Sequence, residues 1–229
     1  MITVSLLGHS QNQKVDIHYF FNQEPLVTNK KYFFEDSMLY MSISNFKFYI
    51  SNIKITHIYE AKVYAKSDKI QLIDFNPNDD NASVYANSDI SLNLFSDIKD
   101  SCYLSFVIGV DSASSMSGNF TESLDPTLGM YWAWNTGYIH LKMEGESNVI
   151  SSANPKFIYH IGGYSGKYAT QTHCSSRVFL PSSAKNNPYI KIDLKDYLCE
   201  MMKTTREKMV MIPGAKAKKF ADNFPMLFH

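Results

Sequence analysis

Two residue types that could form a metal site, histidine and tryptophan, gather in one stretch of the chain, residues 109–163. The stretch contains both tryptophans and two of the seven histidines: Trp132, Trp134, His140 and His160. A further candidate, His18, lies in the first predicted strand. Two or three imidazoles suit copper, although imidazole alone does not exclude zinc or nickel. The chemistry that these residues could perform is therefore metal binding.

His160 lies in a short apolar run that is followed by Gly162 and Gly163. On a strand, His160 would share a face with Ile158. The two glycines allow another part of the chain to approach closely, or allow a bulge. From these residues alone, His160 is either a metal ligand or a hydrogen-bonded histidine of the core.

His140 and His18 are the candidates for a second ligand. Side chains alternate along a strand, so His140 is expected to share a face with Tyr138 and Lys142. That face is predicted to be the polar side of the strand. The alternative interpretation of His140 is a solvated strand residue. His18 alternates with apolar neighbours in the first strand, and the two histidines rank level.

Trp132 and Trp134 are two residues apart, which puts both indoles on one face of an extended strand. Paired tryptophans usually build a core. Indole has an N–H donor and no lone pair for a metal. An unmodified tryptophan could therefore line a metal site but could not coordinate the ion.

Oxygen ligands are concentrated in a polar loop that extends from Asp111 to Gly129 and includes Asp125. Carboxylates of this kind could hold calcium. Their spacing does not fit the twelve-residue loop of an EF-hand. We favour turn chemistry instead, in which Asp111 and Asp125 bind backbone N–H groups.

Many short apolar or alternating segments, separated by turn residues, predict an all-β fold, an antiparallel β-sandwich. One or two short helices are expected near the C-terminus. The predicted strands cover residues 15–21, 40–55, 71–75, 92–98, 103–110, 157–161, 176–180 and 189–194, and residues 130–144 are predicted to form a strand pair or one long bent strand. The helices are predicted over 196–208 and 215–223.

The composition excludes several classes of protein. The 229 residues carry 22 basic and 22 acidic side chains, so nothing favours nucleic acid as a partner. No apolar run is long enough to span a membrane. No acid–base pair, nucleophile motif or phosphate-binding loop is present, so an enzyme is not expected. The three cysteines allow either one disulfide with a buried thiol or three buried thiols.

The N-terminus has two interpretations. Residues 1–13 are either the remnant of a signal peptide or a disordered end, since they lack the basic and apolar regions of a complete signal. Residues 14–229 are then expected to form a single β-sandwich domain.

Several motifs in order resemble the MbnP-like family, the copper-binding partner proteins of methanobactin gene clusters, of the metallo-mystery pair type. The motifs are GVDS (109–112), SG (117–118), LDP (124–126), GMYWAW (129–134), GYIHLKMEG (137–145) and HIGG (160–163). The segment FKFYISNI at 46–53 and the tail at 213–223 extend the resemblance over nearly the whole chain.

The resemblance implies an extracytoplasmic or periplasmic protein for the uptake, storage or delivery of copper. It favours His160 as a ligand, with His18 or His140 second. In related copper proteins a tryptophan is oxidised to kynurenine, which then joins histidines at the metal. The resemblance implies the same here, at Trp134 in preference to Trp132.

The partners that the resemblance implies are an MbnH-like dihaem enzyme and an outer-membrane transporter. One alternative stays open, namely a β-sandwich interaction module that has an exposed aromatic surface and no metal site.

Overall fold

The computed structural model describes residues 11–34, 38–60, 62–75, 89–94, 98, 101–120, 122–134, 137–150, 153–181 and 186–229. The strands are β1 (Gln11–Phe21), β2 (Glu24–Pro25), β3 (Tyr32–Phe33), β4 (Tyr40–His57), β5 (Val63–Ser67), β6 (Gln71–Phe75), β7 (Asp89–Leu94), β8 (Cys102–Ile108), β9 (Tyr131–Trp132), β10 (Gly137–Ser147), β11 (Lys156–Gly162), β12 (Thr172–Val178), β13 (Tyr189–Asp193) and β14 (Met209–Val210). The helices are α1 (Ser112–Met116), α2 (Lys195–Thr205) and α3 (Ala215–Asp222), with short 3-10 turns at Glu122–Leu124, Pro126–Leu128, Gly166–Tyr168 and Phe224–Leu227.

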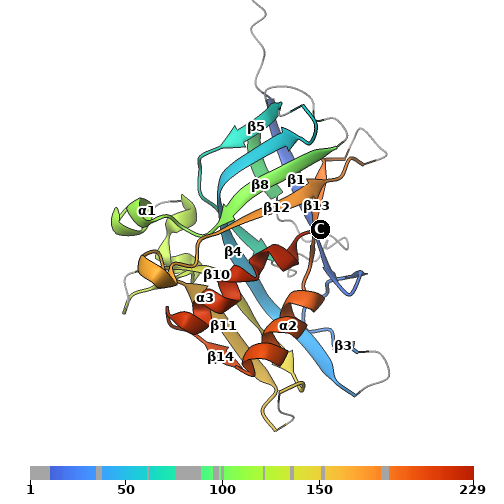
Figure 1. Ribbon diagram of the computed structural model, residues 1–229, viewed down its shortest axis with the longest axis vertical. Helices are drawn as coiled ribbons and strands as arrows, with labels where there is room; N and C mark the ends of the chain where they lie inside the picture. The colour runs from blue at the N-terminus through green and yellow to red at the C-terminus, as the bar shows by residue number, and fades with distance from the viewer. Residues whose placement is uncertain are drawn as a thin grey trace, which may run out of the picture.

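The described strands form one continuous, curled sheet whose centre is β4 (Figure 1). This 18-residue strand pairs with β3, β5, β6, β8 and β10. Its length lets successive partners pair along it, and its register opposite β8 shifts between Ser51 and Lys54. Asn52 takes a φ of 51° there, a left-handed conformation that asparagine adopts more readily than most residues. The sheet is the all-β, sandwich-like fold that the sequence predicts.

Most strand pairs are antiparallel, as predicted, but two are parallel. β1 pairs with β13 in parallel, with Asp16 opposite Tyr189, and β11 pairs with β14. β1 also pairs antiparallel with β7. The first strand of the chain is therefore held between an early and a late segment.

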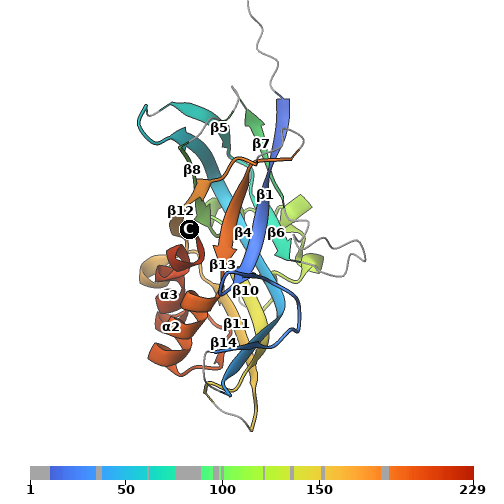
Figure 2. The ribbon, with the colours of Figure 1, turned by 90° about the vertical axis from the view of Figure 1, so that its right-hand side faces the viewer.

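The main hydrophobic core lies between the curled sheet and the C-terminal helices. Figures 1 and 2 show α2 and α3 side by side against one face of the sheet. Phe220 of α3 packs on Tyr159 of β11, with ring centroids 4.6 Å apart. Both side chains are fully buried. The short C-terminal helices that the sequence predicts thus complete the core.

A second, smaller hydrophobic cluster lies under the segment that leads from β8 to β10. Its buried members are Tyr49, Val110, Met130, Trp132, Tyr138 and Ile139. The hydroxyl of Tyr49 donates to the carbonyl of Ser123, and that of Tyr138 donates to the carbonyl of Leu124. These contacts anchor the motif-rich loop to the sheet beside the candidate site.

The predicted strands and helices are present with shifted boundaries, whereas four strands were not predicted: β2, β3, β5 and β14. β6 occupies residues 71–75 as predicted, whereas β12 begins four residues before the predicted start at Ser176. The predicted loop from Asp111 to Gly129 contains α1 and two 3-10 turns. No described helix has the length and apolar character needed to cross a bilayer.

Two predictions extend beyond the described residues. β1 reaches back to Gln11, and residues 1–10 lie outside the part of the chain that the structure describes. The signal-remnant interpretation therefore stays a prediction. Residues 95–97 of the predicted strand 92–98 also lie outside the described residues, and β7 covers Asp89–Leu94.

Candidate functional site

His160 is part of a polar cluster on one face of β10 and β11. The register places Lys142 directly opposite His160, and Glu144 lies two residues further along the same face. The Nε2 atom of His160 is 2.6 Å from Oε1 of Glu144. Nζ of Lys142 is 3.7 Å from the same oxygen. The sheet register alone is enough to bring these three side chains together.

The pKa directions describe a neutral histidine beside an ionised carboxylate. Burial lowers the pKa of His160, and the hydrogen bond to Glu144 only partly opposes this. Burial alone would raise the pKa of Glu144, but the hydrogen bond from His160 and the charge of Lys142 outweigh it, so this pKa is lowered. At neutral pH the imidazole therefore donates its Nε2 hydrogen to a carboxylate.

His140 lies on β10 at a β-bulge, not on the polar side that alternation predicts. Ile139 pairs with Gly162, and Leu141 pairs with Ile161, so the register shifts at His140. A bulge of this kind breaks the two-residue alternation of side chains. The His140 side chain is 0% exposed, and its Nδ1 would lie 2.8 Å from a Cβ placed on Gly109.

One ring nitrogen of His140 has a partner and the other does not. Nδ1 is 2.8 Å from Oγ1 of Thr170, and that hydroxyl donates to the carbonyl of Gly163 at 3.2 Å. Oγ1 can then accept the Nδ1 hydrogen of His140. Nε2 is buried and finds no hydrogen-bond partner among the described residues. Burial lowers the pKa of His140 to about 4, against the opposing effect of the Thr170 and Val110 carbonyls.

Trp132 packs directly on the strand that carries His160. A Cβ placed on Gly162 would lie 2.8 Å from the Trp132 ring and 2.4 Å from the carbonyl oxygen of Tyr138. Gly162 is two residues from His160, so the two positions share a face of β11. The absence of a side chain at Gly162 therefore leaves room for the indole to pack against β11.

Trp134 does not share the strand of Trp132, which corrects the expectation of two indoles on one extended strand. β9 ends at Trp132, and the chain turns at Trp134. Trp132 is 6% exposed and Trp134 is 64% exposed. Their ring centroids are nevertheless 5.8 Å apart. The two indoles are neighbours, one in the small core and one at the surface.

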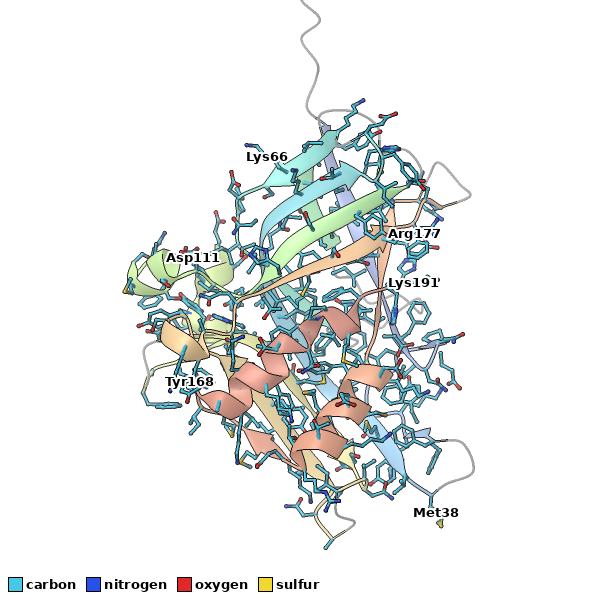
Figure 3. The ribbon with its side chains drawn as sticks, viewed as in Figure 1. Met38, Lys66, Asp111, Tyr168, Arg177 and Lys191 are labelled. Carbon is cyan, nitrogen blue, oxygen red and sulfur yellow. The ribbon has the colours of Figure 1, made fainter. Side chains whose placement is uncertain are left out.

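His18 lies apart from the other two histidines. It is on β1, stacked on Tyr189 of β13 with ring centroids 4.1 Å apart, and paired in register with Lys191. In Figure 3, Lys191 and Asp111 lie on opposite sides of the molecule. The structure brings His140 and His160 to adjacent strands and places His18 in another region.

Asp111 and Asp125 bind backbone N–H groups at the starts of two short helical turns. Oδ1 of Asp111 accepts the backbone N–H of Ser114 at 2.9 Å, and Oδ2 accepts the Ser114 hydroxyl at 2.7 Å. Oδ1 of Asp125 accepts both the N–H and the hydroxyl of Thr127. Burial would raise the pKa of Asp111, but these bonds outweigh it and lower the pKa. The contacts are those of turn chemistry.

Cysteine does not contribute to this site. Cys102, Cys174 and Cys199 are all free thiols, and the first two are buried. Burial raises the pKa of Cys174 to about 12, so it stays a thiol, whereas a metal binds the thiolate. Among the described residues, no group of three or more histidine, cysteine or acidic side chains is arranged to hold a metal.

The sequence argument missed Glu144 and Thr170, the hydrogen-bond partners of the two histidines. A signal for Glu144 was present, because Lys142 and Glu144 alternate on the strand that pairs with His160. No comparable signal existed for Thr170, which reaches His140 from a loop 30 residues away.

Comparison with known proteins gives the family and the fold. A family model described as MbnP matches residues 10–212. The structure is similar to that of MbnP from Methylosinus trichosporium, with a TM-score of 0.58 and 12% sequence identity, over 90% of this chain and 82% of that chain. At this identity the likeness is one of fold. No protein with a curated description matches the chain. Since the family model spans most of the sequence, the chain belongs to the MbnP family.

Proposed function

We propose that this chain is an extracytoplasmic protein that binds copper and serves its uptake, storage or delivery. Copper is the metal implied by the chain's resemblance to methanobactin-associated proteins. The proposal assigns no reaction to the chain. A dihaem enzyme or an outer-membrane transporter would be its partner.

The observation that carries the proposal is the buried His160 imidazole, which is hydrogen-bonded to Glu144. Metal-binding histidines almost always donate their second ring hydrogen to a carboxylate, a carbonyl or water. The 2.6 Å contact between Nε2 and Glu144 has this form.

Copper would be bound through imidazole, a ligand that suits this metal. His160 offers Nδ1 once Nε2 is bonded to Glu144. His140, on the neighbouring strand, has a buried Nε2 without a partner among the described residues. Leaving a buried polar atom unpaired costs about 1–3 kcal/mol. A bound ion would remove that cost.

The proposal includes oxidation of one tryptophan to kynurenine by the dihaem partner, at Trp134 in preference to Trp132. Dioxygen, activated by the partner enzyme, would cleave the indole C2–C3 bond and place one oxygen atom on each carbon. Water would then release C2 as formate, leaving an aryl amine and a ketone. The 64% exposure of Trp134 supports access by a partner enzyme. Protein purified from its native host should be heavier by about 4 Da, as intact mass spectrometry would show. A Trp134→Phe variant should lack the increase.

Copper binding is tested on the purified full chain by competition with a chromophoric chelator. Wild-type protein should bind about one copper with micromolar affinity or tighter. His160→Ala should weaken binding at least about tenfold, because it removes an imidazole ligand. His173→Ala, at an exposed position on β12, is the matched control. Equal binding by wild type and His160→Ala would refute the proposal.

A second candidate function, an interaction module without a metal site, is favoured by exposed aromatic side chains. Trp134 contacts Trp132, and Phe120, also exposed, contacts Tyr131 with ring centroids 5.3 Å apart. An MbnH-like dihaem enzyme from the same source should bind Trp134→Ser at least about tenfold more weakly than wild type. Tyr59→Ser, at an exposed aromatic residue in the turn after β4, is the control. Partner binding without copper binding would favour this function over the first.

A further inference from the structure

We propose that a hollow at the ends of β1 and β13 binds a small organic carboxylate, whose negative charge meets Lys191 and whose apolar part rests on Phe20 and Phe179. The hollow has a volume of about 520 Å³, within the range of about 300–1,000 Å³ that is usual for ligand sites. Its lining includes Phe20, Phe179, Lys191, Asp193, Lys195 and Asp196. The inference goes beyond the proposed function and requires no metal.

Lys191 supplies a cation that is held in place without an acidic partner. Its Nζ lies 4.7 Å from the centroid of the Phe179 ring and 5.8 Å from that of the Phe20 ring. Cation–π contacts extend to about 6 Å. Within the part of the chain that the structure describes, no carboxylate is within ion-pair distance of this Nζ. The ammonium group can therefore meet an anion without first breaking an ion pair.

The two rings lie on the face of the sheet from which Lys191 projects. Phe20 is two residues after His18, the partner of Lys191 in the register of β1 and β13, so the three side chains share a face. Phe179 follows the end of β12 and forms a β-bridge with Tyr189, two residues before Lys191. Phe20 and Phe179 are both partly exposed. They can therefore offer apolar surface to a ligand that reaches Lys191.

The carboxylates that line the hollow have other contacts or lie apart from Lys191. Both oxygens of Asp193 accept backbone N–H groups. Oδ1 accepts that of Lys195 at 3.0 Å, and Oδ2 accepts that of Gln23 at 2.8 Å. Asp196 is exposed in the first turn of α2. Asp193 thus joins the turn after β1 to the start of α2, and it leaves Lys191 without a counter-ion.

The charges around the hollow favour an anion. The guanidinium of Arg177 lies 5.5 Å from the centroid of the Phe179 ring, and Figure 3 shows Arg177 and Lys191 on the same side of the molecule. Three cations stand against two carboxylates here: Arg177, Lys191 and Lys195 against Asp193 and Asp196. The surplus of positive charge attracts an anion, and the rings beside Lys191 reduce the screening of that attraction by water.

A ligand that uses both features carries a carboxylate and an apolar group. A bare anion such as acetate would contact Lys191 but not the rings. An aromatic amine would rest on the rings but would be repelled by the cations. An aromatic carboxylate makes both kinds of contact, so 3-phenylpropionate is the probe.

Binding is measured by NMR of the isotope-labelled full chain during titration with 3-phenylpropionate. The signals of Lys191 and Phe179 should shift and saturate, with a Kd of about 1 mM or tighter for a ligand of this size. Acetate should bind at least about tenfold more weakly, because it buries no apolar surface. The amine 3-phenylpropylamine, with the same ring and the opposite charge, should also bind at least about tenfold more weakly.

The matched variants separate the charge of Lys191 from its packing. Lys191→Met keeps an unbranched apolar stem without the charge and should weaken binding at least about tenfold, whereas Lys191→Arg keeps the charge and should bind within about fivefold of wild type. Lys66→Met, at an exposed lysine of β5, is the control and should bind as wild type does. Three results would each overturn the site: shifts that do not saturate, equal affinities for acetate and 3-phenylpropionate, or wild-type affinity in Lys191→Met.

Discussion

At the scale of single residues, His140 shows how far packing can depart from a strand pattern. Alternation assigns it to the polar face with Lys142, but its side chain is buried at a bulge and packs against Gly109. A side chain at Gly109, where φ is +127°, would meet the imidazole ring. Because the ring is enclosed, its protonation is linked to folding.

The first prediction concerns pH. The pKa of His140 is about 4 in the folded chain and 6.5 as an ordinary value. The unfolded chain therefore binds the proton more readily, and stability falls as pH drops from about 6.5 toward 4. Between about pH 7.5 and pH 5, His140 should account for a loss of about 2 kcal/mol in the free energy of unfolding. Urea unfolding at the two pH values measures this loss.

The matched variants for this prediction are His140→Gln and His173→Gln. His140→Gln should have a lower free energy of unfolding than wild type at pH 7.5. Between pH 7.5 and pH 5 its free energy of unfolding should fall by less than that of wild type. The second removes an exposed histidine and should keep the wild-type pH dependence. If His140→Gln had the same pH dependence as wild type, the buried imidazole would not be the titrating group.

At the scale of elements, the motif GVDS is explained by the start of a helix. Asp111 is the N-cap of α1, and its side chain accepts the N–H of Ser114. The same role falls to Asp125 before the 3-10 turn at Pro126–Leu128. These capping bonds use the oxygens that a calcium ion would need.

The second prediction separates capping from calcium binding. Asp111→Ala should lower the free energy of unfolding by about 1 kcal/mol, the usual cost of losing an N-cap. Asp68→Ala, at an exposed aspartate after β5, should have little effect. Calcium should leave the Tm of wild type unchanged. A calcium-dependent rise in Tm that disappears in Asp111→Ala would instead support the calcium site.

At the scale of the whole molecule, the sheet depends on helices that follow it in sequence. The fully buried Phe220 lies between Tyr159 of β11 and Tyr197 of α2. The Tyr197 hydroxyl donates to the Phe220 carbonyl at 3.3 Å. Helix α3 lies beyond residue 212, where the family match ends, yet it fills the main core.

The third prediction follows from this packing. Phe220→Ala should lower the free energy of unfolding by about 3–5 kcal/mol, because it removes a buried aromatic ring and leaves a cavity. Lys219→Ala, at the adjacent exposed position of α3, should change stability by less than about 0.5 kcal/mol. Denaturant unfolding of both variants makes the comparison. Equal stabilities would mean that α3 is not part of the cooperative core.

The sequence predicted the fold class well because strand periodicity and turn residues are local signals. It could not predict the bulge at His140, since a bulge depends on how β10 pairs with β11. The turn at Trp134 was not predicted, because the two-residue alternation of a strand was assumed to continue from Trp132 to Trp134, whereas β9 ends at Trp132. The contact of Glu144 with His160 could not be predicted, because it depends on the register of β10 and β11.

The parallel pairing of β1 with β13 has a consequence for how the protein is made. β1 is synthesised early, but its partner at Tyr189–Asp193 leaves the ribosome only when most of the chain has been translated. Contacts between such distant segments form slowly, because a long loop must close first. The nascent chain therefore cannot complete its sheet during most of translation. A chain threaded through a secretion channel would face the same delay on the far side.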